Sequence, residues 1–437
     1  MAVGGTMTDM NAARGANAFD DREPFGSRNP SDEGAGPGEA GPSPADPTFP
    51  GLLVQTVDLA AVRHNIGAIK KASGARRLMA VVKADGYSQG ATEVAGAAVL
   101  AGADQLGVAT LQEALDLRES LELRGTSAMI LAWLWHPDEA LELEAAVASG
   151  IHLGVASEEH LAAVIAAGRR ANVRPTVTAM ADTGLNRSGI SVVDGTFERV
   201  AARFGDAHAR GEIDCTGVFS HLACADEPDN PANDMQAGRF REAAAILEKA
   251  GVVKQLNHLS NSPGALTRPD LSFDMVRPGL SVYGLEPVAG RTHGLRPVMR
   301  WEARIPVIKD VPAGEAVSYG RTWVAERDTR TAIIPCGYAD GMPRSASGKF
   351  DVSINGVRYP QVGRVCMDQF VVDLGPDAPV RPGDVAVIVG TRDGEPTADE
   401  LAAAAGTINY EILTAPRGRT RRRHVGVGDS GADHGRT

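Results

Sequence analysis

The chain is poor in cysteine and has no long apolar run. Its four cysteines are Cys215, Cys224, Cys336 and Cys366, and they show neither metal-ligand spacing nor a disulfide framework. This dispersion predicts reduced thiols in a cytoplasmic compartment. No apolar stretch approaches the length that spans a bilayer. The N-terminus has no apolar core before a cleavage site, which argues against a secretory signal.

An excess of positive charge is also absent. The formal net charge is -11 at pH 7, which argues against nucleic acid as the main partner. The basic run RGRTRRRH at residues 417–424 stands in a Gly-rich polar end and is predicted to be a solvated tail. A composition of 43% hydrophobic and 23% charged residues is that of a soluble globular protein.

Two end segments lack periodic apolar residues. Residues 1–50 are rich in Gly, Pro, Ala, Asp and Glu, and residues 426–437 have a similar composition. Neither segment can bury enough surface to offset the entropy of ordering. Both are predicted to be disordered tails.

Residues 51–295 alternate short β-rich runs with stretches of helical period, which indicates parallel strands joined by crossover helices. The predicted strands are 78–83, 105–110, 128–134, 151–156, 176–182, 215–221, 253–260 and 274–280. Eight such units predict an α/β fold with a closed (β/α)8 barrel. An open doubly wound sheet is the structural alternative, but no G-x-G-x-x-G follows the first strand.

The texture changes after about residue 295. Runs of β-forming residues separated by Gly, Pro and Asn-Gly turns predict a C-terminal all-β domain over residues 296–425. One short helix is predicted at residues 397–406, capped by Thr397 with Glu400 three residues later.

Polar residues stand where the predicted barrel strands end, and barrel chemistry gathers at that rim. They include Lys83, Asp182, His221, Ser260 and Arg277. Burial at the end of an apolar strand lowers the pKa of an amine and frees its lone pair to form an imine with a carbonyl. The alternative for Lys83 is a side chain that extends out of the barrel mouth into solvent.

Loops after the seventh and eighth strands are common phosphate sites, which makes Ser262 and the amide of Gly279 candidate donors. A helix cap and a turn glycine are the alternatives. Arg277 stays protonated, so it can donate to a heterocyclic nitrogen and keep that nitrogen unprotonated. His221 could stack on the ring or orient the arginine, or be a hydrogen-bonded residue of the rim. Arg187, in a Gly-rich turn, could reach a phenolate or carboxylate, or form a loop ion pair.

Eight motifs occur in an order that resembles the alanine racemase family. They are VVKADGYSQG, ADTGLNRSG, SNSPGAL, FDMVRPGLSVYGL, AVSYGRTW, PCGYADGMPR, GRVCMDQ and TINYEIL, spread over roughly residues 52–425. The resemblance implies a pyridoxal 5′-phosphate enzyme with an N-terminal barrel and a C-terminal β domain. It also implies a homodimer with shared active sites that interconverts L-alanine and D-alanine and supplies D-alanine for peptidoglycan.

By this resemblance Lys83 binds the cofactor aldehyde, Arg277 faces the pyridine nitrogen, and Arg187 lies near the phenolate and the substrate carboxylate. The residues that match the family's phosphate contacts are Tyr87, Ser262, Gly279, Leu280 and Tyr410. His221 is expected to help to orient Arg277.

The resemblance also assigns two residues of the β domain. Tyr319 matches a second catalytic base delivered by the partner subunit, and Met367 lies where a backbone amide binds the substrate carboxylate. Racemisation removes a weakly acidic Cα proton and returns it to the opposite face, so it needs an electron sink and two bases. Without the resemblance, Tyr319 would be interpreted as a buried tyrosine of the β domain.

The sequence departs from the family pattern at two places. Met180 stands where many relatives have a lysine that can be carbamylated, so Arg187 must be held by an anion or by Asn186. Ser88 and Gln89 replace the usual Gly-His. The open alternatives are a racemase of broader specificity, acting on serine or basic amino acids, and a non-enzymatic protein that binds carbohydrate or peptide.

Overall fold

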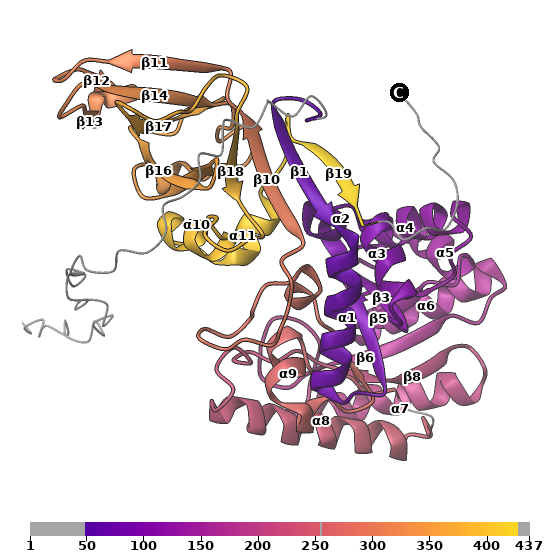
Figure 1. The fold of residues 1–437 in the computed structure, drawn as a ribbon. Coiled ribbons are helices and arrows are strands. Elements are labelled where there is room, and N and C mark those ends of the chain that lie inside the picture. Colours follow the sequence, from indigo (N-terminus) through magenta and orange to yellow (C-terminus); the bar gives the residue numbers. More distant parts are fainter. Residues whose placement is uncertain (1–48, 254–255, 427–437) are drawn as a thin grey trace, which may run out of the picture. The chain divides into compact units, whose positions relative to one another are not determined.

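The structure is a computed structural model that describes residues 49–253 and 256–426, and Figure 1 shows its strands and helices along the chain. The predicted disordered tails lie outside the described residues except at 49–50 and 426. In the described part of the chain, no helix is both long and apolar enough to cross a membrane.

The N-terminal domain is built on a curled sheet of parallel strands. These are β2 (Arg77–Val81), β3 (Gln105–Val108), β4 (Met129–Ala132), β5 (His152–Val155), β6 (Thr176–Asp182), β8 (Asp214–Phe219) and β9 (Met275–Val276), with the short β7 (Ile190–Ser191) beside β6. Neighbours pair in the order β9, β2, β3, β4, β5, β6, β8. The strands are shorter than the sequence predicted, since β2 ends two residues before Lys83.

The seventh predicted strand closes the sheet into a ring. Residues 254 and 255 of this segment are not described, but His258 forms a parallel bridge with Phe219 at the end of β8. On its other side, the N–H of Arg277 donates to the carbonyl of Ser260 at 2.8 Å. The predicted barrel is therefore confirmed. The carboxyl ends of its strands meet at one rim, as parallel strands require.

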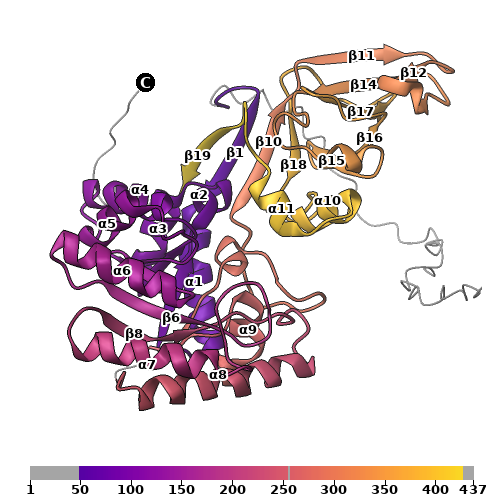
Figure 2. The same cartoon turned by 180° about the vertical axis from the view of Figure 1, so that it is seen from behind.

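Helices follow most of the barrel strands. They are α1 (Leu59–Ser73), α2 (Lys83–Ser88), α3 (Ala91–Leu100), α4 (Leu111–Leu123), α5 (Ala140–Ala148), α6 (Glu158–Ala171), α7 (Thr196–Ala209), α8 (Pro231–Lys249) and α9 (Ser262–Thr267). In α6 the Ser157 hydroxyl accepts from the His160 amide, and Asn172 ends the helix in a left-handed conformation. Figure 2 shows α7 and α8 side by side.

The C-terminal domain is mainly an antiparallel sheet, as the sequence predicted. Within this domain the sheet contains β10 (Met299–Arg304), β11 (Val307–Val311), β14 (Thr329–Ile334), β15 (Asp351–Ile354), β16 (Val357–Val362), β17 (Phe370–Gly375) and β18 (Val385–Val389). β12 (Ala316–Val317) and β13 (Trp323–Val324) pair with each other in a separate two-stranded sheet. Asn355 and Gly356 both have positive φ and form the predicted tight turn between β15 and β16. The helices are α10 (Ala398–Ala405) and α11 (Asn409–Thr414), and Thr397 and Glu400 form the predicted capping box of α10.

Two terminal strands join this second sheet. β1 (Leu53–Asp58), within the range that the sequence placed in the barrel, pairs antiparallel with β10. On its other edge β1 pairs in parallel with β19 (Arg421–Val425), as both views show. The prediction of a solvated tail at residues 417–424 is therefore wrong. Residues 421–424 of the run belong to β19, the edge strand of the sheet, where charged side chains are common because they discourage further strand pairing.

Candidate active site

One cavity at the rim of the barrel collects most of the predicted site residues. Its volume is about 430 Å³. The predicted residues that line it are Lys83, Tyr87, Arg187, His221, Ser262, Arg277, Gly279, Leu280 and Tyr410. Tyr410 comes from α11 of the C-terminal domain, so this helix completes a site that the barrel begins.

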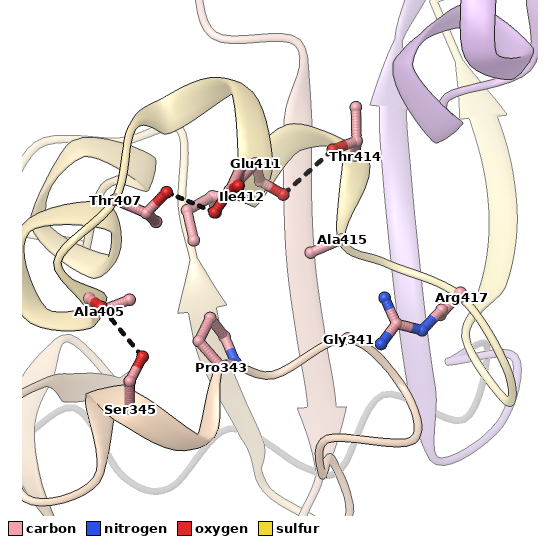
Figure 3. Close-up of a pocket in the computed structure, with 10 residues that line it drawn as sticks. All are labelled: Gly341, Pro343, Ser345, Ala405, Thr407, Glu411, Ile412, Thr414, Ala415 and Arg417. Carbon is pink, nitrogen blue, oxygen red and sulfur yellow. Dashed lines mark hydrogen bonds between the residues drawn. The ribbon is translucent and has the colours of Figure 1, made fainter.

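A second cavity lies within the C-terminal domain and contains none of these residues. It measures about 350 Å³ and is shown in Figure 3. Some of its polar groups bond to one another, since the Ser345 hydroxyl donates to the Ala405 carbonyl and the Thr407 hydroxyl donates to Glu411. The rim cavity is the candidate active site because it collects most of the predicted site residues.

Lys83 is half-buried at the start of α2 and faces this cavity. Burial lowers the pKa of its amine, and the nearby charge of Arg187 lowers that pKa further, while Glu113 acts in the opposite direction. The Nζ atom lies 5.9 Å from the centroid of the Trp133 ring. A larger fraction of this amine is therefore uncharged and nucleophilic than for a lysine in water.

The turn that follows Lys83 is left-handed. Ala84, Asp85, Gly86 and Tyr87 have φ angles of 53°, 51°, 61° and 55°, and Ser88 continues the run at 60°. A left-handed helical conformation costs roughly 1–2 kcal/mol for each residue that has a Cβ atom. Strain of this kind persists only where surrounding contacts impose it, and it is typical of functional sites.

Packing and hydrogen bonds within the barrel support part of this turn. Glu113 accepts from the Ala84 amide at 2.8 Å, and the ring of Tyr87 packs on that of Tyr283 with centroids 4.5 Å apart. A Cβ atom on Gly86 would lie 3.0 Å from the Ala91 nitrogen, so the turn also needs a glycine there.

Arg277 lines the cavity and is fixed by backbone carbonyls. Its guanidinium donates to the carbonyls of Ser220, His258 and Leu259, the last at 3.2 Å. Burial lowers the pKa of Arg277 to about 9. The carbonyls favour the cation, so the group remains charged at neutral pH and can donate into the cavity.

The side chain that orients Arg277 is His258. Its Nδ1 atom lies 3.1 Å from the guanidinium, whereas His221, which the sequence analysis proposed for this task, makes no hydrogen bond to Arg277 within the described residues. The prediction for His221 as the orienting residue is therefore wrong. His258 is fully buried and stacks on Phe219 with ring centroids 5.3 Å apart.

His221 lines the cavity as a neutral ring. Burial lowers its pKa to about 3, and the positive charges of Arg277, Arg187 and Lys83 act in the same direction. A histidine in this state is a poor acid. It can instead pack against a bound aromatic ring.

The lining of the cavity also includes uncharged hydrogen-bonding groups. Ser262 accepts from the amides of Gly279 and Ser281, at 2.9 and 3.2 Å. Burial raises the pKa of Tyr87 and raises that of Tyr410 to about 12, so both phenols stay protonated. Neutral donors of this kind suit a phosphate group.

Arg187 projects from the loop after β6 and has no hydrogen bond or ion pair within the described residues. The Asp182 carboxylate binds the amides of Gly184 and Asn186 at 2.9 and 3.1 Å and thereby shapes the loop. Asn186 does not hold Arg187, contrary to one of the two suggestions from the sequence. Met180 lines the same cavity as Arg187, and its sulfur accepts from the Ser188 hydroxyl at 3.2 Å.

Comparison with known proteins decides the family. The model of the alanine racemase N-terminal domain matches residues 57–287, and that of the alanine racemase C-terminal domain matches residues 298–424. The chain belongs to the alanine racemase family. It is therefore a racemase enzyme, as the sequence analysis predicted.

Named relatives agree with this assignment. The alanine racemase of Salinispora arenicola is 52% identical over 359 residues, which cover 82% of this chain and 94% of that protein. That of Mycolicibacterium vanbaalenii is 47% identical and covers 86% and 95%. Among solved structures, alanine racemase from D-cycloserine-producing Streptomyces lavendulae has a TM-score of 0.82 at 42% identity, covering 86% of this chain and 98% of that one.

Two residues assigned by the alanine racemase resemblance lie outside the cavity. Tyr319, in a 3₁₀ turn at Tyr319–Arg321, is 71% exposed, and Met367 is 53% exposed. The alternative interpretation of Tyr319 as a buried tyrosine is therefore wrong. Within one chain, neither residue meets Lys83 in the rim cavity.

Sequence reasoning missed Trp133, which lines the cavity with its ring centroid 5.9 Å from Nζ of Lys83. A Cβ atom on Gly107 would lie 3.0 Å from the indole of Trp133, and one on Gly154 would lie 3.0 Å from the Cβ atom of Trp133. Glycines inside neighbouring strands are a known sign of a bulky side chain passing close to the backbone. That signal is present in the sequence, at the centres of β3 and β5.

Proposed function

We propose that this enzyme interconverts L-alanine and D-alanine with pyridoxal 5′-phosphate bound in the rim cavity. The observation that carries the proposal is that one cavity brings these groups together. It places the amine of Lys83, whose pKa is lowered by burial, together with a fixed guanidinium at Arg277 and a group of neutral donors around Ser262. When bound, the cofactor supplies the electron sink that makes the Cα proton acidic enough to remove.

The residues of the cavity fit this cofactor. Lys83 would bind the aldehyde, and Arg277 would donate to the pyridine nitrogen while His221 packs against the ring. The groups that would hold the phosphate are Tyr87, Ser262, Gly279, Leu280 and Tyr410. A Cβ atom on Gly279 would lie 2.3 Å from the Tyr87 hydroxyl, so a glycine is needed at this position of the cavity lining.

Racemisation also needs a base on the second face of the substrate, and exposed residues of the C-terminal domain suit that role. We assign the second base to Tyr319 of the partner subunit, with Met367 of the partner subunit binding the substrate carboxylate. The exposure of these two side chains supports the assignment, because a tyrosine that is 71% exposed is available to another chain. The proposed assembly is a homodimer with shared sites.

One of the two residues, Lys83 or Tyr319 of the partner subunit, would remove the Cα proton from one face of the substrate, and the other would donate a proton to the opposite face, with the roles exchanged in the reverse direction. Arg187 has no partner in the described residues and is available to bind the phenolate and the substrate carboxylate. Curated relatives named alanine racemase support alanine over serine or basic amino acids. All four cysteines are free thiols, which supports a reducing, cytoplasmic compartment.

The test begins with borohydride reduction of the purified protein in the presence of pyridoxal 5′-phosphate. We expect the label on the peptide that contains Lys83 and its loss in Lys83→Ala, with the exposed Lys71→Ala as the matched control. Solvent deuterium should then enter Cα of both alanine enantiomers, faster than Cα of serine or lysine. Label on another lysine would overturn the cofactor site, and faster exchange with serine or lysine would overturn the substrate.

A further inference from the structure

The left-handed turn after Lys83 is tied to the C-terminal strand of the chain. Arg422 of β19 donates to the Asp85 carboxylate at 2.6 Å. His424, two residues later on the same strand, lies with Nε2 2.8 Å from the carbonyl of Gln89. These two bonds join positions 337 and 335 residues apart.

A third tie comes from the segment that leads into this strand. The Ser88 hydroxyl donates to the Thr414 carbonyl at 3.0 Å, at the end of α11. The same helix carries Tyr410, whose ring lies 6.5 Å from that of Tyr87 between centroids. Hydrogen bonds thus join residues 85–89 to residues 414–424, which are more than 300 residues away in the sequence.

The register of β19 explains why alternate residues reach the turn. Arg422 pairs with Gln55 of β1 and His424 pairs with Val57, so both side chains stand on one face of the strand. Arg421 stands on the other face and donates to the Pro50 carbonyl at 3.3 Å. The strand therefore contains its own control position, an arginine of equal charge that does not touch the turn.

Two of the contacts around the turn involve backbone groups. His424 binds the backbone carbonyl of Gln89, whose own side-chain amide is fully buried and has no hydrogen-bond partner in the described residues. The Asp85 carboxylate uses its second oxygen to accept from the Ala91 amide at 3.0 Å. The His424 contact fixes the carbonyl of Gln89, and the Asp85 contact fixes the amide of Ala91, so each restrains the backbone next to the turn.

We propose that β19 acts as a clamp in which Arg422 and His424 hold the left-handed turn and thereby aim the Lys83 amine into the cavity. Tyr87 lies within the same turn, so the clamp would position the amine and a phosphate donor together. The proposal rests on the function assigned to Lys83 above. Arg422 and His424 are positioning residues, because neither lines the cavity.

The clamp is collective rather than dependent on a single contact. The side chains of Arg422 and Asp85 are 32% and 58% exposed, so water screens their ion pair. We expect Arg422→Gln to raise amide hydrogen exchange in the peptide covering residues 84–90 by roughly two- to fivefold. The double variant Arg422→Gln, His424→Gln should raise it further, and Arg421→Gln should leave it unchanged.

The same variants should change how Lys83 reacts with pyridoxal 5′-phosphate. A loosened turn exposes the amine to water and weakens the effect of burial, so the pH midpoint for covalent capture of the cofactor should move upward. Arg422→Lys keeps the charge and should restore most of the exchange protection and the midpoint. A purely structural role for Arg422 would lower the unfolding temperature without moving this midpoint.

A double-mutant cycle guards against general loss of folding. Asp85→Asn combined with Arg422→Gln should raise exchange no more than either single variant, because each change removes the same contact. The proposal is overturned if Arg422→Gln and Arg421→Gln give the same exchange and the same pH midpoint. If the unaltered protein captures no cofactor at Lys83 while exchange still responds to Arg422→Gln, the cofactor assignment fails and the clamp on the turn stands.

Discussion

At the scale of single residues, the chemistry of the site depends on charges that surround one amine. Burial has the largest effect and lowers the pKa of the Lys83 amine, the positive charge of Arg187 lowers that pKa further, and the carboxylate of Glu113 raises it. The balance lowers the pKa of the amine and makes it a nucleophile and a base. Burial keeps the His221 ring neutral, and the positive charges of Arg277, Arg187 and Lys83 act in the same direction.

Replacement of Arg187 and replacement of Glu113 should shift the pKa of the Lys83 amine in opposite directions. Arg187→Gln removes a positive charge, so the pKa of Lys83 rises and the midpoint for covalent capture of pyridoxal 5′-phosphate shifts to higher pH. Glu113→Gln removes a negative charge, so the pKa falls and the midpoint shifts to lower pH. A pH profile of the capture rate measures both, and shifts of the same sign would contradict this account of the amine.

At the scale of elements, the site depends on close approaches between segments. The turn at α2 meets the loop after β9, where Gly279 leaves room for the hydroxyl of Tyr87. The strand ends place Lys83 and Arg277 at one rim, and the loop after β6 adds Arg187. None of these segments can move alone without changing the cavity.

Gly279→Ala should test the tightest of these approaches. The new Cβ atom would lie 2.3 Å from the Tyr87 hydroxyl and 3.2 Å from the ring carbon that bears it. Overpacking of this kind costs roughly 1–3 kcal/mol, so we expect affinity for pyridoxal 5′-phosphate to fall by about one to two orders of magnitude. Calorimetric titration of the cofactor-free protein measures it.

A second substitution separates the clash from other causes. Tyr87→Phe removes the hydroxyl that the new Cβ atom would meet, so the double variant Gly279→Ala, Tyr87→Phe should bind more tightly than the sum of the two single losses implies. If the losses of cofactor-binding free energy in the two single variants simply add in the double variant, the glycine is not needed to avoid this clash.

At the scale of the whole molecule, sequence patterns predicted what is local and missed what is distant. The eight barrel segments and the capping box at Thr397 depend on residues near one another in the chain, and both were found. The basic run at residues 417–424 was assigned to solvent because its partners, Thr56 and Asp85 among them, lie more than 330 residues away. Local sequence patterns do not reveal contacts between residues so far apart in the chain.

The candidate site divides in the same way. Lys83, Ser262 and Arg277 could be predicted because strand ends gather at one rim of a barrel. His258 was missed because its role depends on contact with Arg277 across two neighbouring segments. The roles of Tyr319 and Met367 came only from the family resemblance, since neither side chain meets the cavity of its own chain.

The central claim is that Lys83 of one subunit works with Tyr319 of the partner subunit, and mixed dimers test it most directly. Lys83→Ala and Tyr319→Phe should each abolish most racemisation of alanine. Co-expression of the two variants should restore roughly a quarter of the unaltered activity, because half of the dimers are mixed and each has one intact site. Mixed dimers as inactive as either parent, or a monomer with full activity, would contradict the claim.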